Sequence, residues 1–378
     1  MVRNASPPFS TRVIRWQRRH GRRDLPWQAT RDPYRIWLSE VMLQQTQVAV
    51  VIPYYERFVA RFPDVAALAA AGEDEVLALW SGLGYYSRAR NLHRAAREVV
   101  REHGGRFPRD SQSLQALPGI GRSTAAAIAA FAANERGAIL DGNVKRVIAR
   151  HAGIGGDPAK PSVVAALWNE AESRLPERGI AEYTQGMMDL GATVCVRQRP
   201  VCEACPVASD CVARREHRID ELPGKRARAQ RPRKAIAMLV VVSRGEVLLE
   251  KRPPSGIWGG LWSLPEAPVE ADPEQALFAA SGLVATSVER LAPFEHTFTH
   301  FTLEVRPLRI GIGQPRSRGR RPGPSMVWMP LTELRGAALP APVRRLLDQL
   351  LRLQELVQHR ETHRRVGELE QLLLDVDP

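Results

Sequence analysis

The chain has 378 residues and a formal net charge of +13, from 54 Lys and Arg against 41 Asp and Glu. This length is sufficient for two or three domains that each bury a core of their own. The longest apolar stretch, residues 125–133, is too short to span a bilayer, and the N-terminus lacks an apolar signal core. These features exclude an integral membrane protein and predict a soluble, cytoplasmic one.

The positive charge is confined to the first part of the chain. Residues 1–240 hold 37 Lys and Arg against 24 Asp and Glu, whereas residues 241–378 hold 17 of each kind. A localised positive field is typical of a protein that binds a polyanion. The alternative is a generally basic protein from an arginine-rich proteome, and the neutral second part argues against it.

Residues 1–222 have the pattern of an all-helical domain. Apolar residues recur there at intervals of three and four, and prolines and other turn residues separate the periodic segments. The following segment, 223–234, is rich in positive charge and contains no acidic residue. Such a composition predicts an exposed basic linker that could follow a phosphate backbone.

The second part reads as an α+β domain over residues 235–345. Aliphatic stretches bounded by Gly and Pro turns predict strands at 235–242, 246–250 and 301–305. Helical patterns cover 274–281 and 342–357, and residues 346–378 are predicted to form an amphipathic helical tail.

All four cysteines lie in one short segment, residues 195–211, as Cys195, Cys202, Cys205 and Cys211. Disulfides would connect distant segments, so this clustering indicates a metal site. Four thiolates could hold zinc, but zinc sites usually pair two short knuckles, and only Cys202 and Cys205 form one. The single compact run with unequal spacing favours an iron–sulfur cubane, with one thiolate at each iron.

Residues 117–125, LPGIGRSTA, predict a hairpin that leads into a helix. Gly119 and Gly121 permit a sharp turn and a close backbone approach, and the helix N-terminus offers free N–H groups to an anion. In a basic helical domain we expect that anion to be a DNA phosphate, as in a helix-hairpin-helix motif. Asp141, twenty residues after Gly121, is predicted to cap the helix that begins near Asn143, which does not exclude a catalytic role.

These motifs resemble the helix-hairpin-helix DNA glycosylases with an iron–sulfur loop, and more closely the adenine DNA glycosylases of the MutY type. The resemblance covers about residues 8–345. Besides the hairpin and the cysteines, it rests on LPW at 25–27, WLSEVMLQQTQV at 37–48, GLGYYSRARNLH at 82–93 and LDGNV at 140–144. It implies a monomeric bacterial enzyme, active at the nucleoid, with a 4Fe–4S cluster. It also implies that adenine opposite 8-oxoguanine or guanine is flipped out of duplex DNA and its N-glycosidic bond hydrolysed.

The resemblance makes Glu40 the acid of this reaction, because adenine leaves poorly until a ring nitrogen is protonated. The apolar residues around Glu40 in its helix are expected to raise its pKa, whereas a solvated helix glutamate is the alternative. Asp141 is expected to stay ionised and to face the oxocarbenium-like sugar, with Asn143 assisting it.

Other side chains are assigned to DNA by the same resemblance. They fill the space of the flipped base, wedge beside the lesion, contact phosphate or line the adenine pocket: Gln44, Gln45, Thr46, Leu83, Tyr85, Gly119, Gly121, Ser123, Trp27 and Gln185. Core packing is the alternative for Tyr85. Position 28, often arginine in relatives, is Gln28 in this chain. Ser123 stands where the endonuclease III group carries a Schiff-base lysine, so no dedicated strand cleavage is expected.

Residues 252–262 resemble part of a Nudix hydrolase fold, and Gly260 and Glu266 begin a Nudix-like spacing. Residues 274–279 lack the glutamate pair that would hold magnesium, so this domain is expected to bind rather than to hydrolyse. The related loop that meets 8-oxoguanine is Phe-Ser-His, and here its place is taken by Phe298, Thr299 and His300.

Three other functions compete with this interpretation. Ser123 and the Nudix-like domain argue against an oxidised-pyrimidine glycosylase with lyase activity. A non-enzymatic mismatch-binding protein would leave Glu40 and Asp141 without a role. A hydrolase that cleans the nucleotide pool is disfavoured by the incomplete Nudix motif.

Overall fold

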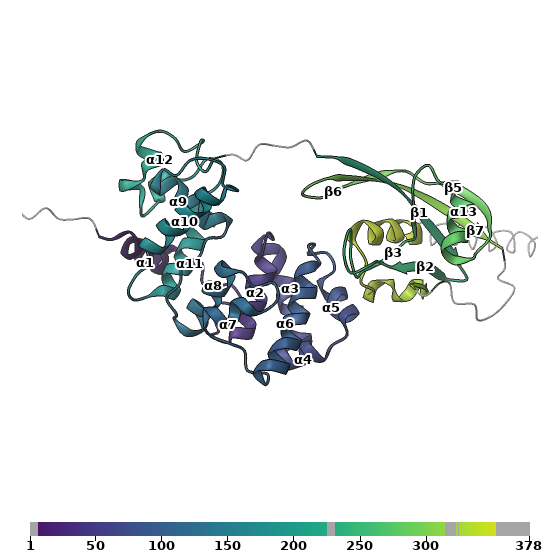
Figure 1. Cartoon of the computed structure of the whole chain (residues 1–378), viewed down its shortest axis with the longest axis horizontal. Coiled ribbons are helices and arrows are strands. Elements are labelled where there is room, and N and C mark those ends of the chain that lie inside the picture. Colours follow the sequence, from purple (N-terminus) through teal and green to yellow (C-terminus); the bar gives the residue numbers. More distant parts are fainter. Residues whose placement is uncertain (1–6, 225–230, 314–322, 324, 353–378) are drawn as a thin grey trace, which may run out of the picture. The chain divides into compact units, whose positions relative to one another are not determined.

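The computed structural model describes residues 7–224, 231–313, 323 and 325–352 (Figure 1). The chain divides into two compact units, one formed by residues 1–76 and 87–229 and the other by residues 77–86 and 230–378. Half of the predicted linker, residues 225–230, lies outside the described ranges, as does most of the predicted tail, residues 353–378. None of the helices in the described ranges has an apolar stretch of membrane-spanning length.

The first unit is helical, as the periodicity predicts. Its α-helices, with the end of α5 belonging to the second unit, are α1 (Phe9–His20), α2 (Pro33–Leu43), α3 (Val48–Arg61), α4 (Val65–Ala70), α5 (Glu73–Trp80), α6 (Ser87–His103), α7 (Ser111–Ala116), α8 (Arg122–Ala133), α9 (Gly142–Ala152), α10 (Pro161–Ser173), α11 (Ile180–Asp189) and α12 (Val212–Arg215). Short helical turns precede and interrupt the cysteine segment: η1 (Leu190–Val194), η2 (Cys202–Ala204) and η3 (Ala208–Asp210).

Aspartates start several of these helices. The carboxylates of Asp32, Asp64, Asp110 and Asp141 accept hydrogen bonds from backbone N–H groups in the first turns of α2, α4, α7 and α9. An N-terminal turn leaves such N–H groups without helical partners, so each carboxylate stabilises the start of its helix. The cap that the sequence predicts at Asp141 is therefore present.

The alanine-rich helix α8 forms the centre of the first unit. Ala125 to Ala130 are all buried, and α8 packs against α2, α7 and α11. Gly119, in the hairpin before α8, has a φ of +81°, and a Cβ atom there would come within 2.8 Å of the Asn91 side chain. Because the buried side chains of α8 are small, α2 and α11 can pack closely against α8. These two helices carry Glu40 and Gln185.

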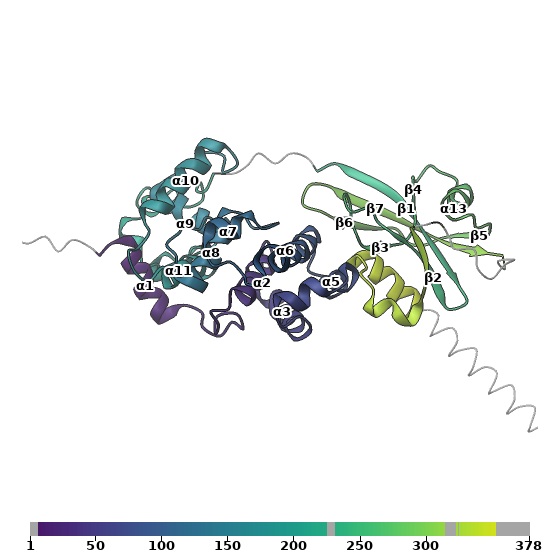
Figure 2. The same cartoon turned by 60° about the horizontal axis from the view of Figure 1, so that its bottom comes forward.

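The second unit contains a mixed sheet (Figure 2). Its elements are β1 (Arg233–Ser243), β2 (Glu246–Lys251), β3 (Trp262–Ser263), β4 (Glu266–Ala267), α13 (Pro273–Ser281), β5 (Ala285–Arg290), β6 (Phe294–Thr297), β7 (Thr302–Ile312), β8 (Met326–Pro330) and η4 (Leu331–Gly336). A further helix covers residues 341–352.

The order β3-β2-β1-β7-β5 runs through the sheet, with β4 on β1, β6 on β7 and β8 on β2. The central pair, β1 and β7, is parallel, and its register joins Arg233 to Thr302 and Val241 to Ile310. The predicted strand at 301–305 extends to residue 312, and β1 begins at Arg233, within the predicted linker. Leu239, Val241 and Ile310 form the core with Leu277 of α13.

Candidate active site

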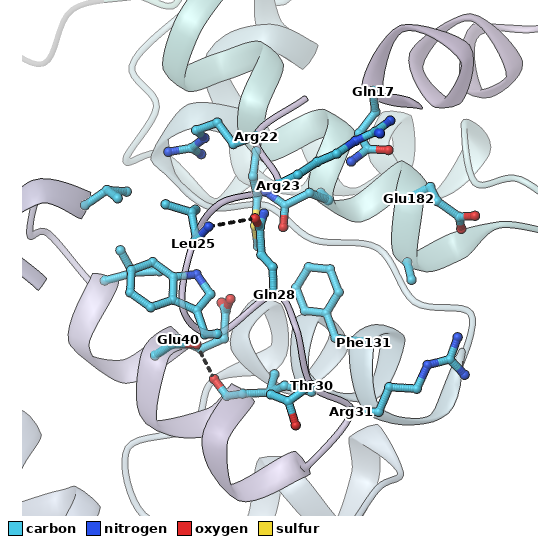
Figure 3. A pocket seen from close by; sticks show the side chains of 18 residues that line it. Gln17, Arg22, Arg23, Leu25, Gln28, Thr30, Arg31, Glu40, Phe131 and Glu182 are labelled. Carbon is cyan, nitrogen blue, oxygen red and sulfur yellow. Dashed lines mark hydrogen bonds between the residues drawn. The ribbon is translucent and has the colours of Figure 1, made fainter. Parts of the chain in front are cut away.

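A cavity of about 320 Å³ lies in the first unit and is lined by parts of α1, α2, α8 and α11 and by the loop after α1 (Figure 3). Its wall mixes charged and amide side chains with aromatic ones. The lining includes Arg22, Trp27, Gln28, Glu40, Phe131 and Gln185. The structure therefore brings Trp27, Glu40 and Gln185, which the sequence assigns to the base pocket, to one cavity.

The pKa of the Glu40 carboxyl lies well above that of an ordinary glutamate. Glu40 lies in the last turns of α2. The residue as a whole is partly exposed, but its carboxyl is enclosed. Desolvation, together with the nearby charge of Asp141, raises the pKa of this carboxyl to about 8. A protonated carboxyl in a cavity wall can donate a proton to a bound group.

Asp141 is held differently, at the N-terminus of α9. Burial raises the pKa of Asp141, while the N–H groups of Val144 and Asn143 and then the charge of Arg146 lower it. The Val144 N–H donates to Asp141 Oδ1 over 2.7 Å. These donors stabilise the carboxylate form, so of the two acids Asp141 is the one suited to carry negative charge.

Arg146 connects this helix start to the cysteine segment. Its Nη2 donates to Asn143 Oδ1 over 2.8 Å and to the Gly191 carbonyl over 2.6 Å, and its Nε donates to the Cys195 carbonyl over 2.7 Å. A Cβ atom at Gly191 would lie 2.7 Å from Asn143 Cβ, so this approach requires glycine. Arg146 has no role predicted from the sequence, although its place three residues after Asn143 puts both side chains on one helix face.

Gln185 is oriented by a buried ion pair that the sequence analysis also missed. Its Nε2 donates to Asp189 Oδ1 over 2.9 Å. The side chain of Asp189 is 1% exposed and also accepts from Arg22, whose Nη2 lies 2.7 Å from the same oxygen. Because Asp189 holds the amide nitrogen of Gln185, the orientation of the amide is fixed and its carbonyl oxygen is an acceptor for a ligand in the cavity. In the sequence, the signal for this pair was Asp189 itself, an acidic residue on the buried face of α11 one turn after Gln185.

Gln28 presents the other end of its side-chain amide to the cavity, the donor end. Its Oε1 accepts from the Leu25 N–H over 3.3 Å, the dashed line beside Leu25 in Figure 3, which leaves its Nε2 as a donor. Phe131, another residue without a predicted role, supplies an aromatic ring to the wall next to Gln28. The cavity thus combines an amide acceptor, an amide donor, a protonated acid and aromatic surface.

Ser123 stabilises the backbone next to Asp141. Its hydroxyl oxygen accepts from the Leu140 N–H over 2.9 Å. The neighbouring Thr124 contacts the turn after α2, because Gln44 Nε2 lies 3.4 Å from Thr124 Oγ1. The hairpin helix α8 therefore links two sets of residues that the sequence predicts to act on DNA.

The four cysteines line one enclosed cavity together with apolar residues and Arg150. Burial, together with the neighbouring thiolates, raises the pKa of Cys205 to about 12, so ionised cysteines here require positive charge. Among the described residues, no three Cys, His, Asp or Glu side chains converge on one ion. The four thiols around this cavity are the candidate ligands of a metal group.

Other contacts hold the cysteine segment in place. Arg150 is buried, and its guanidinium donates to the carbonyls of Val196 and Leu222 over 2.8 Å each and lies 3.5 Å from Cys195 Sγ. The loop is also joined to α1, because Arg12 donates to both carboxylate oxygens of Asp210 over 2.8 and 2.6 Å. These contacts, and not the cysteines alone, fix the shape of the segment.

In the second unit, Phe298, Thr299 and His300, which the sequence predicts to contact the lesion, lie in the turn between β6 and β7. The turn is closed by the Phe298 N–H, which donates to the Phe301 carbonyl over 2.9 Å, and the two rings stack with centroids 4.5 Å apart. Tyr85, which belongs to this unit, has its hydroxyl 3.0 Å from Thr299 Oγ1. Two residues that the sequence assigns to the lesion are therefore in contact.

The carboxylate that remains of the Nudix-like motif, Glu266, is neutralised by an arginine. Glu266 pairs with Arg252 over 3.1 Å, and both side chains are largely buried. Burial raises the pKa of Glu266, whereas Arg252 lowers it. Helix α13 brings no pair of glutamates to this position, since its sequence is PEQALFAAS. A carboxylate already paired with a guanidinium is a poor ligand for a magnesium ion.

Helices that present a hairpin and two acids, followed by a Nudix-like sheet, define a DNA glycosylase of base excision repair. Accordingly, residues 38–173 match the HhH-GPD superfamily of base excision DNA repair proteins, and residues 237–349 match the NUDIX domain. A thermostable thymine-DNA glycosylase has a similar structure, with a TM-score of 0.50, 30% identity, and coverage of 55% of this chain and 95% of its own.

Sequence relatives are more specific. The adenine DNA glycosylase of Buchnera aphidicola (subsp. Acyrthosiphon pisum) is 35% identical over 90% of this chain and 97% of its own length. That of Mus musculus is 36% identical over 88% of this chain and 75% of its own, and that of Homo sapiens 35% identical over 84% and 69%. The chain belongs to the adenine DNA glycosylase family, which confirms the resemblance found in the sequence.

Proposed function

We propose that this protein is a monofunctional glycosylase that removes adenine paired with 8-oxoguanine or guanine in duplex DNA, acting as a monomer. The observation that carries the proposal is a pair of neighbouring acids, Glu40 in the cavity wall and Asp141 at the N-terminus of α9. Desolvation raises the pKa of Glu40 to about 8 with no cation to oppose it, whereas the rise that burial causes in the pKa of Asp141 is opposed by backbone donors that favour the charged form. Two acids in opposed protonation states are what the hydrolysis of a glycosidic bond requires.

In this mechanism the target nucleotide is flipped out of the duplex and its base enters the 320 Å³ cavity. Glu40 donates its proton to a ring nitrogen of adenine, so that the base leaves neutral when the glycosidic bond breaks. Asp141 stabilises the positive charge that develops on the sugar, and water then completes the hydrolysis at that carbon. Asn143, held by Arg146, supports the carboxylate at the start of α9.

The amide polarities in the cavity support adenine as the base. Gln185 offers its carbonyl oxygen, which would accept from the exocyclic amino group of adenine, and Gln28 offers an N–H to a ring nitrogen. Guanine has a carbonyl oxygen where adenine has the amino group, so it would face Gln185 with two acceptors. An unpaired acceptor of this kind strongly disfavours the wrong base.

The hairpin and the positive charge of the first part support duplex DNA as the partner. Gly119 and Gly121 precede the N-terminus of α8, where free N–H groups can bind a phosphate. Gln44, Gln45 and Thr46 form the turn proposed to fill the space of the flipped base. Leu83 and Tyr85 are proposed to enter beside the base opposite it.

The cysteines would hold a 4Fe–4S cluster, with one thiolate of Cys195, Cys202, Cys205 and Cys211 at each iron. When bound, the cluster would supply positive charge to these thiolates and cross-link the loop. The loop residues Arg197, Arg199 and Arg214 would then be held for phosphate contacts.

The second unit is proposed to read the lesion strand through the turn formed by Phe298, Thr299 and His300. This role is supported by the contact of Thr299 with Tyr85 and by the neutralised Nudix remnant. Adenine is a normal base, so an enzyme that removes it must also recognise the base on the opposite strand. The cavity contacts adenine alone and cannot do this.

Three duplexes test this function: adenine opposite 8-oxoguanine, adenine opposite guanine, and thymine glycol opposite adenine. We expect release of adenine from the first two, with strand breaks only after alkali, because Ser123 provides no amine. Glu40→Gln is the matched control and should bind without releasing base. Cleavage of the thymine glycol strand without alkali, with a borohydride-trapped adduct, would instead identify a bifunctional pyrimidine glycosylase.

A further inference from the structure

Arg88, near the start of α6, is a buried cation next to the C-terminus of α2. The residue is only 8% exposed, and its guanidinium is directed to the end of α2 and the following turn. Nη1 donates to the carbonyls of Val41, Met42 and Gln44 over 3.0, 2.8 and 2.6 Å, and Nη2 donates to Thr46 Oγ1 over 3.1 Å. These carbonyls belong to the last turn of α2 and its cap, where helical partners end.

The two groups of acceptors serve different parts of the proposed mechanism. Val41 and Met42 follow Glu40 directly in α2. Gln44 and Thr46 flank Gln45, whose φ of +58° is unusual for a residue with a side chain. A positive charge at a helix C-terminus is favourable, but a cap would need only the α2 carbonyls. The hydrogen bond to Thr46 extends the same guanidinium to the turn.

We propose that Arg88 is a positioning residue that holds the acid Glu40 and the turn of residues 44–46 in one fixed arrangement. The inference rests on the proposed function, in which this turn enters the duplex and Glu40 protonates the flipped base. One rigid, planar group bonded to both segments transmits the position of the turn to the last turn of α2. Proton transfer depends steeply on such placement, and an error of about 1 Å costs on the order of 100-fold in rate.

Lysine and methionine at position 88 separate this role from simple packing. Arg88→Lys keeps the charge but lacks the fork that reaches several acceptors, and Arg88→Met keeps much of the volume and donates nothing. Arg97→Met is the matched control, because Arg97 is an exposed arginine of the same helix. Each variant is first checked by circular dichroism to be folded well below its melting temperature.

Single-turnover adenine release and mismatch affinity are then measured separately. We expect both Arg88 variants to lose about 100-fold in rate with an affinity within about threefold of the wild type, and Arg97→Met to keep the wild-type rate. Thr46→Val should lose several-fold in rate, and should cost less when added to Arg88→Met than alone, because the bond between Arg88 and Thr46 is lost in both and only the contact of Thr46 with the Gln44 carbonyl is lost in addition.

The outcomes distinguish this inference from the proposed function. Unchanged rates in the folded Arg88→Lys protein would overturn the role of Arg88, and so would additive effects of Thr46→Val and Arg88→Met. If Arg88→Met does not fold, the cycle is run with Arg88→Lys. A wild-type protein that releases no adenine would instead overturn the proposed function itself.

Discussion

Each unit of this protein contains a desolvated carboxyl whose pKa is raised, and only one of these two carboxyls is paired with an arginine. Glu40 has no cation among the groups that shift its pKa, and desolvation with the charge of Asp141 raises that pKa to about 8. Glu266 is also desolvated, but Arg252 lies 3.1 Å away and opposes the shift. Burial alone therefore does not create a reactive acid. The difference is whether a guanidinium neutralises the carboxylate or a proton does.

The largest effect should come from removing the proton donor of the first unit. We expect Glu40→Gln to bind the mismatch normally and to lose about a thousandfold in single-turnover adenine release, because an amide cannot protonate the base. Asp141→Asn should also lose most activity while folding normally. Glu266→Gln is the matched control in the other unit and should stay within about twofold of wild type. Near wild-type rates for Glu40→Gln would show that Glu40 is not the proton donor.

The cysteine segment should depend on iron. Purified protein is expected to be brown and to contain about four irons per chain with no zinc. Cys202→Ser should lose iron and most DNA affinity, because the loop arginines lose their support. The measurements are metal analysis, visible absorbance and binding to an unmodified duplex. One zinc per chain and no iron would contradict this expectation.

The pH dependence should follow Glu40. The carboxyl is protonated below its pKa of about 8, so adenine release should fall as the pH rises through that value. The free energy of unfolding should fall as the pH rises from the ordinary glutamate pKa of 4.5 to about 8, since the folded chain holds this proton over that range and the unfolded chain does not. Glu40→Gln should lose that part of the pH dependence of stability. Single-turnover rates and denaturant unfolding at several pH values test both, and a rate that stays constant to pH of about 9.5 would be evidence against the acid.

The smallest effect is expected in the second unit, because it has no part in breaking the bond. A Thr299→Ala, His300→Ala double variant should lose about 1–3 kcal/mol of the preference for 8-oxoguanine over guanine opposite adenine. Removal of adenine opposite guanine should change little. The ratio of rates on the two duplexes is the measurement. If that ratio does not change, the turn between β6 and β7 has another role.

The amino-acid sequence by itself determined what depends on local pattern. Helical periodicity and turn residues predict the first unit, and alternation with Gly and Pro turns predicts the strands of the second. The aspartate cap at Asp141 and the glycines of the hairpin follow from the conformations that those residues favour. The unequal spacing of the cysteines leads only to the prediction of an iron–sulfur cluster, whereas the motif around Glu40 carries the family resemblance.

Tertiary structure decided what depends on partners far apart in the chain. Arg22 and Asp189 are separated by 167 positions, and only their pairing makes Gln185 an acceptor in the cavity. The same holds for Arg88, whose acceptors lie more than forty positions earlier. The parallel pairing of β1 with β7 likewise joins distant segments. Local periodicity records which face of an element is buried, but a hydrogen bond or an ion pair depends on which group the folded chain brings to that face.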